Sequence, residues 1–214
     1  MLEKTVTSLD GAFQWLSRLA LLNMLWLLTS LAGLVAAGLF PATSAMLAVT
    51  RKWLMEGTEF PTIKTYFRQV KQDFWKANLI GWILTAAAGL LYFNFEILLQ
   101  WNAEFSIIVT AAFYFIVFLF LLVCVNIFPL FVHYEAGIKT LFKNAFIIGL
   151  ARLPMTLAIL VILSGMVYFS VVLPAGFLFF SGSLVSYTVM KLMLWSLKKI
   201  DVGISETEQV EYSG

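Results

Sequence analysis

Five long apolar stretches constrain the fold of this chain more than any other feature of its sequence. They lie near residues 15–39, 77–99, 105–131, 155–173 and 176–197. A helix rises about 1.5 Å per residue, so about 20 apolar residues cross the hydrocarbon layer of a bilayer while their backbone polar groups bond within the helix. The sequence therefore predicts an all-α fold, a polytopic transmembrane helical bundle of about five spans within residues 1–200.

The composition indicates that lipid is part of the solvent of this bundle. Of the 214 residues, 61% are hydrophobic and 12% are charged, which is more apolar surface than a soluble domain of this length can bury. The net charge of +2 is too small and too dispersed to indicate a nucleic-acid partner. From Asp201 onward the chain becomes polar and acidic, so we expect residues 201–214 to form a disordered acidic tail.

The Lys and Arg residues gather between alternate spans, which predicts how the chain is oriented. Short cytoplasmic connections retain positive charge. Twelve of the fourteen basic residues fall in three such groups: Arg51, Lys52, Lys64, Arg68, Lys71 and Lys76; Lys139, Lys143 and Arg152; and Lys191, Lys198 and Lys199. Five spans with a cytoplasmic C-terminus place the N-terminus outside, although Lys4 and Arg18 favour the opposite side. The segment from Gly33 to Pro41 could also bend back into the membrane.

The first basic connection predicts an amphipathic helix at the cytoplasmic surface. At helical spacing its apolar face comprises Ile63, Phe67, Val70 and Phe74, and its polar face comprises Lys64, Arg68, Lys71 and Gln72. Such a helix either rests in the anionic headgroup layer or docks a cytoplasmic partner. The sequence leaves both interpretations open.

The two long basic connections share a short internal similarity. Residues 63–68 (IKTYFR) match residues 138–143 (IKTLFK), and each connection begins near a Phe-Pro pair, Phe40-Pro41 and Phe128-Pro129. One explanation is a duplicated unit of span, exit proline, basic helix and span, as in parallel transporter repeats. The other is convergence of short basic helices at a membrane surface.

No pattern in the sequence predicts catalysis. His133 is the only histidine and Cys124 is the only cysteine, which excludes a paired-histidine mechanism and a cysteine-based metal cluster within one chain. The sequence has neither a phosphate-binding glycine loop nor a GxSxG turn. We therefore expect a protein that is not an enzyme, with no catalytic residues, no cofactor and no metal.

Small polar residues within the spans leave a pore as an alternative. They are Asn23, Thr29, Ser30, Asn78, Thr85, Thr110, Asn126, Ser164, Ser170, Ser181, Ser183 and Ser186. Such side chains more often bond their own helix or a neighbouring one. The spacing of Gly81, Thr85 and Gly89 likewise favours close helix packing.

Five sequence blocks give the chain a resemblance to the YesL-like family of bacterial membrane proteins. The blocks are Gly38 to Thr43, Arg51 to Leu54, Asp73 to Asn78, Phe128 to Tyr134 and Phe179 to Ser183. The resemblance implies a small multi-pass protein of the bacterial cell membrane with no established activity. It also implies a gene commonly placed beside those of carbohydrate ABC importer subunits and sugar-responsive regulators.

A second, shorter resemblance links residues 135–154 to the cytoplasmic loop through which ABC importer permeases contact their ATPase. Glu135, Ala136, Leu153 and Pro154 match the pattern of that loop at its spacing. Leu141 stands where the loop has a glycine, which puts the break in its short helix in doubt. The resemblance implies docking on importer subunits.

We therefore expect a non-catalytic accessory subunit of a carbohydrate ABC importer. Its expected partners are the lipid bilayer and the permease or ATPase subunits of the importer. The residues expected to contact such a partner are Ile63, Lys64, Phe67, Arg68, Glu135, Lys139, Phe142 and Lys143. Two alternatives remain open: a stand-alone transporter or channel, and a membrane regulator of a sugar-sensing signalling system.

Overall fold

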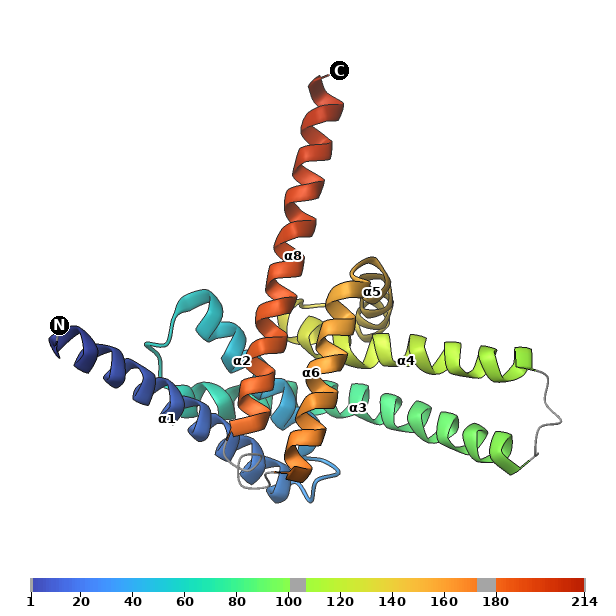
Figure 1. The fold of residues 1–214 in the computed structure, drawn as a ribbon, viewed down its shortest axis with the longest axis horizontal. Helices are drawn as coiled ribbons and strands as arrows, with labels where there is room; N and C mark the ends of the chain where they lie inside the picture. The colour runs from blue at the N-terminus through green and yellow to red at the C-terminus, as the bar shows by residue number, and fades with distance from the viewer. Residues whose placement is uncertain (1, 101–106, 173–179, 214) are drawn as a thin grey trace.

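The computed structural model describes the backbone of residues 2–100, 107–172 and 180–213, and the side chains of residues 11, 13–100, 107–172 and 180–198. These residues form helices and no strand, which confirms the predicted all-α class. The helices are α1 (Leu2–Ala32), α2 (Leu39–Glu56), α3 (Thr62–Gln100), α4 (Ile107–His133), α5 (Ile138–Ala151), α6 (Leu153–Val172) and α8 (Gly182–Ser213) (Figure 1).

Among the described residues, four helices are long and apolar enough to cross a membrane: Phe13–Ala32 within α1, and the whole of α3, α4 and α6. They coincide with four of the five predicted spans. The fifth predicted span begins at residues 176–179, outside the described part, and its residues 182–197 lie in α8. The described backbone continues α8 to Ser213. The domain limit at residue 200 and the disordered tail after it stay predictions.

The amphipathic segment around Ile63 and the second predicted span form one continuous helix, the 39-residue α3. No Gly or Pro interrupts the chain between Thr62 and Leu79, so nothing in this stretch breaks the helix where it passes from polar to apolar sequence. The second predicted basic helix is separate and corresponds to α5.

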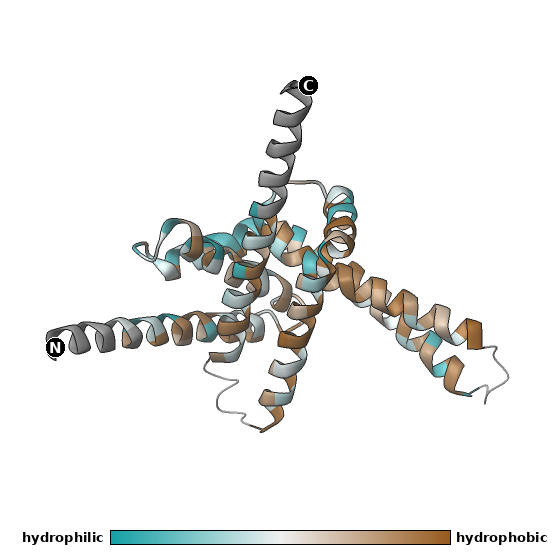
Figure 2. Cartoon of the chain, turned by 45° about the horizontal axis from the view of Figure 1, so that its top comes forward, coloured by the Kyte–Doolittle hydropathy of each residue, from teal (hydrophilic) through white to brown (hydrophobic). Residues whose placement is uncertain are grey.

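Helix α2 occupies the centre of the molecule. It contacts α1, α3, α4 and α8, and nine of its 18 residues are buried. The α3–α4 hairpin leaves this centre in a different direction from α6 and α8 (Figure 1). The far halves of α3 and α4 are strongly apolar (Figure 2) and expose large side chains such as Leu90, Phe93 and Phe115. Such side chains suit contact with lipid.

A tight turn over residues 33–38 reverses the chain between α1 and α2. The first predicted span runs to Leu39, whereas α1 ends at Ala32. Two glycines permit the reversal, because a Cβ on Gly33 would overlap the backbone of Gly38, and a Cβ on Gly38 would meet carbonyl oxygens of α1. Between them, Val35 has a φ of 61°, a strained value for a β-branched residue.

Helix α2 consequently packs back along α1. The indole Nε1 of Trp26 donates a hydrogen bond to Oγ1 of Thr43 over 3.1 Å. A buried apolar cluster that includes Leu22 of α1 and Met46 of α2 fills the contact between them. The sequence predicted a cytoplasmic connection here, but the structure has a central helix that is covered by protein.

Small polar residues join helices within the bundle. Oδ1 of Asn23 in α1 accepts a hydrogen bond from the backbone N–H of Ser183, in the first turn of α8, over 3.1 Å. Nδ2 of Asn126 in α4 donates to Oγ1 of Thr156 in α6 over 3.2 Å. Thr85 instead donates to a carbonyl of its own helix. These bonds match the packing interpretation of such residues.

The two Phe-Pro pairs meet but occupy different places in their helices. The rings of Phe40 and Phe128 stack with centroids 6.2 Å apart and an interplanar angle of 9°. Pro41 lies in the first turn of α2, where its missing N–H costs nothing, whereas Pro129 lies inside α4. Pro129 therefore lies near the exit of its helix, as the repeat hypothesis assumed, whereas Pro41 lies at the start of one. An ancestral duplication stays a hypothesis.

Candidate functional site

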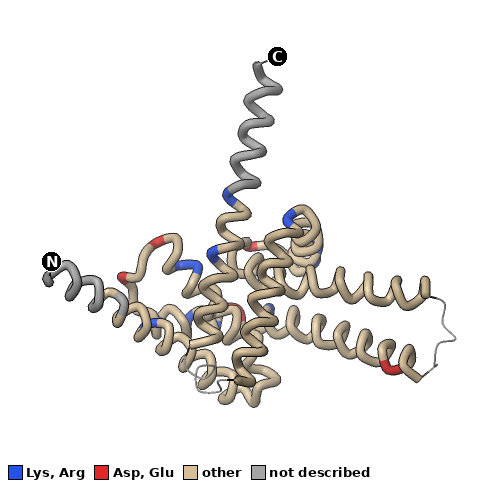
Figure 3. The backbone as a smooth tube through the Cα atoms, viewed as in Figure 1, with Lys and Arg blue, Asp and Glu red and all other residues tan. Residues whose placement is uncertain are grey.

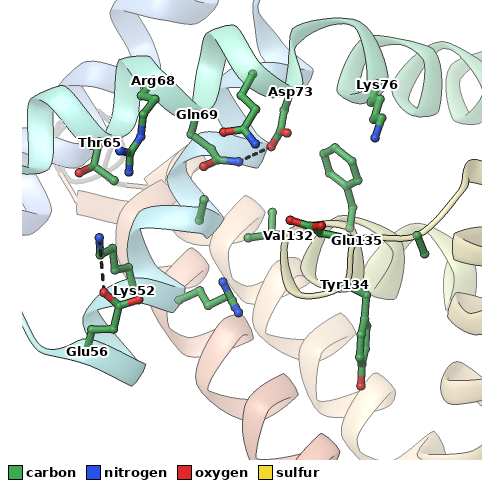
Figure 4. A pocket seen from close by; sticks show the side chains of 15 residues that line it. Lys52, Glu56, Thr65, Arg68, Gln69, Asp73, Lys76, Val132, Tyr134 and Glu135 are labelled. Carbon is green, nitrogen blue, oxygen red and sulfur yellow. Dashed lines mark hydrogen bonds and ion pairs between the residues drawn. The ribbon is translucent and has the colours of Figure 1, made fainter.

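A polar cavity of about 410 Å³ lies between α2, the first half of α3 and the end of α4. Its charged lining residues come from all three walls (Figure 4). They are Arg51, Lys52 and Glu56 of α2, Arg68, Asp73 and Lys76 of α3, and Glu135 of the connection between α4 and α5. We refer to this space as the polar cavity.

The α3 wall is a stripe of polar side chains at helical spacing. It comprises Thr65, Arg68, Gln69, Gln72, Asp73 and Lys76, which recur every three or four residues and so share one face. Oδ2 of Asp73 accepts hydrogen bonds from Oγ of Ser44 over 3.0 Å and from Nε2 of Gln69 over 2.7 Å. Because Ser44 belongs to α2, this carboxylate holds α3 against α2.

The α2 wall is joined to α4 by a contact between residues 82 positions apart in the sequence. Nε of Arg51 donates to Nδ1 of His133 over 3.1 Å, which requires that nitrogen to carry no proton. The His133 ring also meets the Tyr134 ring edge to face, with centroids 4.7 Å apart. The end of α4 is thereby fixed beside α2.

Lys52 contacts Glu56 of its own wall and Phe60 of the connection that follows α2. Its Nζ lies 3.4 Å from Oε2 of Glu56 one turn later and 4.7 Å from the centroid of the Phe60 ring. Both contacts engage the ammonium group at the edge of the cavity. Lys52 and Glu56 therefore largely balance each other's charge.

The structure separates the residues that the sequence predicted as partner contacts. Arg68 and Glu135 line the polar cavity. Ile63, Lys64 and Phe67 are exposed on α3 away from its lining, and Lys139 and Lys143 are exposed on α5. Phe142 is half-buried and packs against the core. Their role as partner contacts stays a prediction.

Sequence reasoning missed most of the residues that make the cavity. The stripe on α3 could have been found from its spacing, since Arg68 and Gln72 were already placed on a polar face. The sequence around Arg51 does not predict that it lines a cavity, because its position there depends on α2 being a central helix. The sequence gives no signal for His133 either, although this residue is half-buried and bonded to Arg51.

Two other cavities in the described part of the chain are lined mainly by apolar side chains. One, of about 230 Å³, touches Trp26, Phe128 and the half-buried Cys124. The other, of about 490 Å³, lies between α6 and the start of α8. Among the described residues, no three His, Cys, Asp or Glu side chains gather as metal ligands.

Comparison with known proteins places these features in a family. Residues 19–95 match the family described as "Protein of unknown function, DUF624". Three proteins of Bacillus subtilis (strain 168) are similar to the chain. Uncharacterized protein YesL is 32% identical over 94% of this chain and 95% of its own length. Uncharacterized protein YteU is 31% identical over 88% of this chain and 84% of its own length. Uncharacterized protein YesV is 31% identical over 94% of this chain and 97% of its own length. No solved structure matches the chain.

Proposed function

The chain belongs to the YesL-like family described as DUF624, and on that premise we propose that it is a non-catalytic integral membrane protein that serves as an accessory subunit of a carbohydrate ABC importer. Its partners would be the lipid bilayer and the permease or ATPase subunits of the importer. Four apolar helices with exposed apolar side chains support the membrane location. The resemblance of residues 135–154 to the importer loop supports the choice of partner.

The observation that carries the docking proposal is the exposed side of α5. Lys139 and Lys143 are exposed in its first half, and Ile147 is 48% exposed one turn after Lys143. Leu141, where the importer loop has glycine, is only 1% exposed, and α5 runs unbroken from Ile138 to Ala151. The segment is therefore one rigid helix, held by its buried side and presenting a basic and apolar side.

A stand-alone transporter or channel has less support. A conducting path needs polar groups that face a pore, but Asn23 and Asn126 bond neighbouring helices, and Thr85 and Ser170 bond their own helix. A membrane regulator of a sugar-sensing system would use the same exposed side of α5. Binding of importer subunits to this chain is expected only under our proposal, so measuring it distinguishes the proposal from these two alternatives.

Affinity purification from native membranes tests the importer association. We expect a tagged chain in mild detergent to recover importer permease or ATPase subunits. Combining Lys143→Glu with Ile147→Glu should lower that recovery at least about tenfold, as expected for truncated interface anchors. Recovery is measured by quantitative mass spectrometry relative to the tagged chain.

The matched control combines Lys71→Glu with Trp75→Glu on α3. Both side chains are exposed and stand one turn apart, as Lys143 and Ile147 do, and neither lies on α5. This variant should recover the importer subunits as the unchanged chain does. Wild-type protein that brings down no importer component would contradict the proposal, and equal losses in both variants would exclude α5 as the docking element.

We further propose that both ends of the chain face the cytoplasm. The expectation of an external N-terminus assumed a first span that ends near Leu39, but α2 packs back along α1. Arg18 precedes Trp26 by eight residues and Arg51 follows Thr43 by eight, and Trp26 bonds Thr43. Both arginines therefore lie at the same end of the helix pair, opposite the turn.

Charge supports the same orientation at the other connections. Residues 33–38, 101–106 and 173–179 contain no Lys or Arg. The outer half of the α3–α4 hairpin likewise shows no basic residue (Figure 3). With α2 returning along α1, all fourteen basic residues can face the cytoplasm, as the positive-inside rule favours.

Cysteine labelling of intact cells tests this orientation. In a Cys124→Ser background, we expect an impermeant maleimide to label an Ala36→Cys variant from outside, because Ala36 is exposed in the α1–α2 turn. A Glu59→Cys variant, in the exposed connection between α2 and α3, should react only after the membrane is permeabilised. The reverse pattern would place the N-terminus outside.

A further inference from the structure

The polar cavity contains more positive than negative charge once its internal contacts are counted. Lys52 pairs with Glu56, and the Asp73 carboxylate accepts bonds from Ser44 and Gln69. Among the described residues, no ion pair or hydrogen bond engages the side-chain charges of Arg68, Lys76 or Glu135.

Arg51 adds a third available cation to this set. It uses Nε for His133, so its two terminal nitrogens keep four N–H donors. Three cations, Arg51, Arg68 and Lys76, therefore face the space with one uncommitted carboxylate, Glu135. The bonds from Ser44 and Gln69 are neutral and leave the charge of Asp73 in place. The four cations of the lining therefore exceed its three carboxylates by one positive charge, which favours an anionic ligand.

We propose that the polar cavity binds a phosphate ester that carries hydroxyl groups. A phosphate ester bears about one to two negative charges at neutral pH, which offsets this excess, and it presents more acceptor oxygens than a carboxylate does. Guanidinium groups suit phosphate because their planar fork donates two parallel hydrogen bonds. The cavity's volume of about 410 Å³ falls within the range of small-ligand sites.

The other polar residues of the lining indicate that the ligand also carries hydroxyl groups. The carboxylate of Glu135, on the wall opposite α3, can accept hydrogen bonds from ligand hydroxyls, while the α3 stripe adds the amides of Gln69 and Gln72. Figure 4 shows Arg68, Gln69 and Lys76 extending from α3 toward the other walls. A ligand with a phosphate at the Arg68 and Lys76 side and hydroxyls toward Glu135 would satisfy both sets.

Glycerol phosphate has this chemistry and has two sources beside a membrane. It occurs as a free solute and as the headgroup of phosphatidylglycerol. The first source would reach the cavity from water, the second from the adjoining leaflet. The proposal concerns the cavity alone and does not depend on an importer partner.

Titration of the full chain in phosphatidylcholine nanodiscs tests the free solute. Isothermal calorimetry with glycerol 3-phosphate should give saturable binding that Arg68→Gln and Lys76→Gln each weaken about tenfold or more, the value of one charge-assisted hydrogen bond. Lys64→Gln and Lys71→Gln are matched controls, since they remove the same charge from exposed sites on the same helix outside the cavity lining. These controls should bind within about twofold of the unchanged chain.

Native mass spectrometry from mixed phosphatidylglycerol and phosphatidylcholine nanodiscs tests the lipid source. Selective retention of phosphatidylglycerol that Arg68→Gln and Lys76→Gln abolish, and the two controls preserve, would support the lipid form of the ligand. Glu135→Gln should weaken binding of either glycerol-phosphate form relative to inorganic phosphate, whose own affinity should be unchanged or higher because the substitution removes a negative charge from the cavity. The proposal is overturned if neither source binds, or if all four basic-residue variants lose binding equally, since that would reflect general surface charge.

Discussion

Replacing Gly81 with alanine is expected to destabilise the chain by about 3 kcal/mol and to reduce its folded yield. A Cβ on Gly81 would overlap the ring carbons of Phe40. That ring cannot move freely, because it stacks on Phe128 and meets Trp82 edge to face, with both centroids 6.2 Å away. The substitution must separate α3 from α2 or force the ring from its rotamer. Thermal unfolding of the purified chain in detergent measures the loss.

Gly89→Ala is the control on the same helix. Within the part of the chain that the structure describes, no atom lies within 4 Å of a Cβ at Gly89. Alanine is more stable than glycine in the interior of a helix. The free energy of unfolding of this variant should therefore be unchanged or higher by up to about 1 kcal/mol. Equal unfolding temperatures for the Gly81 and Gly89 variants would show that Phe40 does not pack on α3 as described.

The helices that are long and apolar enough to cross a membrane could be predicted from the sequence, because the stretches that could cross it are almost continuously apolar. The stretch predicted at 105–131 became α4, Ile107–His133, with residues such as Phe115 exposed to the surroundings. A helix that faces lipid on most sides must be apolar on most sides. Composition alone then reveals it.

Helix α2 could not be predicted in this way because protein rather than lipid covers it. Small residues such as Ala42, Ser44 and Ala45 are fully buried there, and they allow neighbouring helices to approach closely. Arg51 and Lys52 near its end lower its mean hydropathy. A helix of this kind reads as a polar connection until its neighbours are known.

Only one wall of the polar cavity could be predicted from the sequence, for the same reason. Its α3 wall, with Arg68 and Lys76 among its residues, follows from helical spacing alone. Its other walls need the return of α2 and the contact between Arg51 and His133, which joins residues far apart in the sequence. No local pattern encodes such a contact.

Replacing Gly38 with alanine is expected to cost about 3 kcal/mol as well, because the α1–α2 turn would have to open. The φ of Gly38 is −94°, so alanine fits its backbone conformation and only space forbids it. A Cβ there would lie 2.5 Å from the carbonyl oxygen of Thr29 and 2.8 Å from that of Ser30. Both obstacles are backbone atoms, which cannot rotate away as a side chain can. Thermal unfolding in detergent again provides the measurement.

Gly165→Ala in α6 is the control for this substitution, since no described atom lies within 4 Å of a Cβ at that position. It should leave the unfolding temperature unchanged or raise it. A Gly38 variant as stable as this control would mean that Gly33 and Gly38 do not approach closely. The turn would then be too wide to hold α2 against α1, and the shared level of Arg18 and Arg51 would no longer follow. A cytoplasmic N-terminus would lose its structural support, whatever the charge distribution favours.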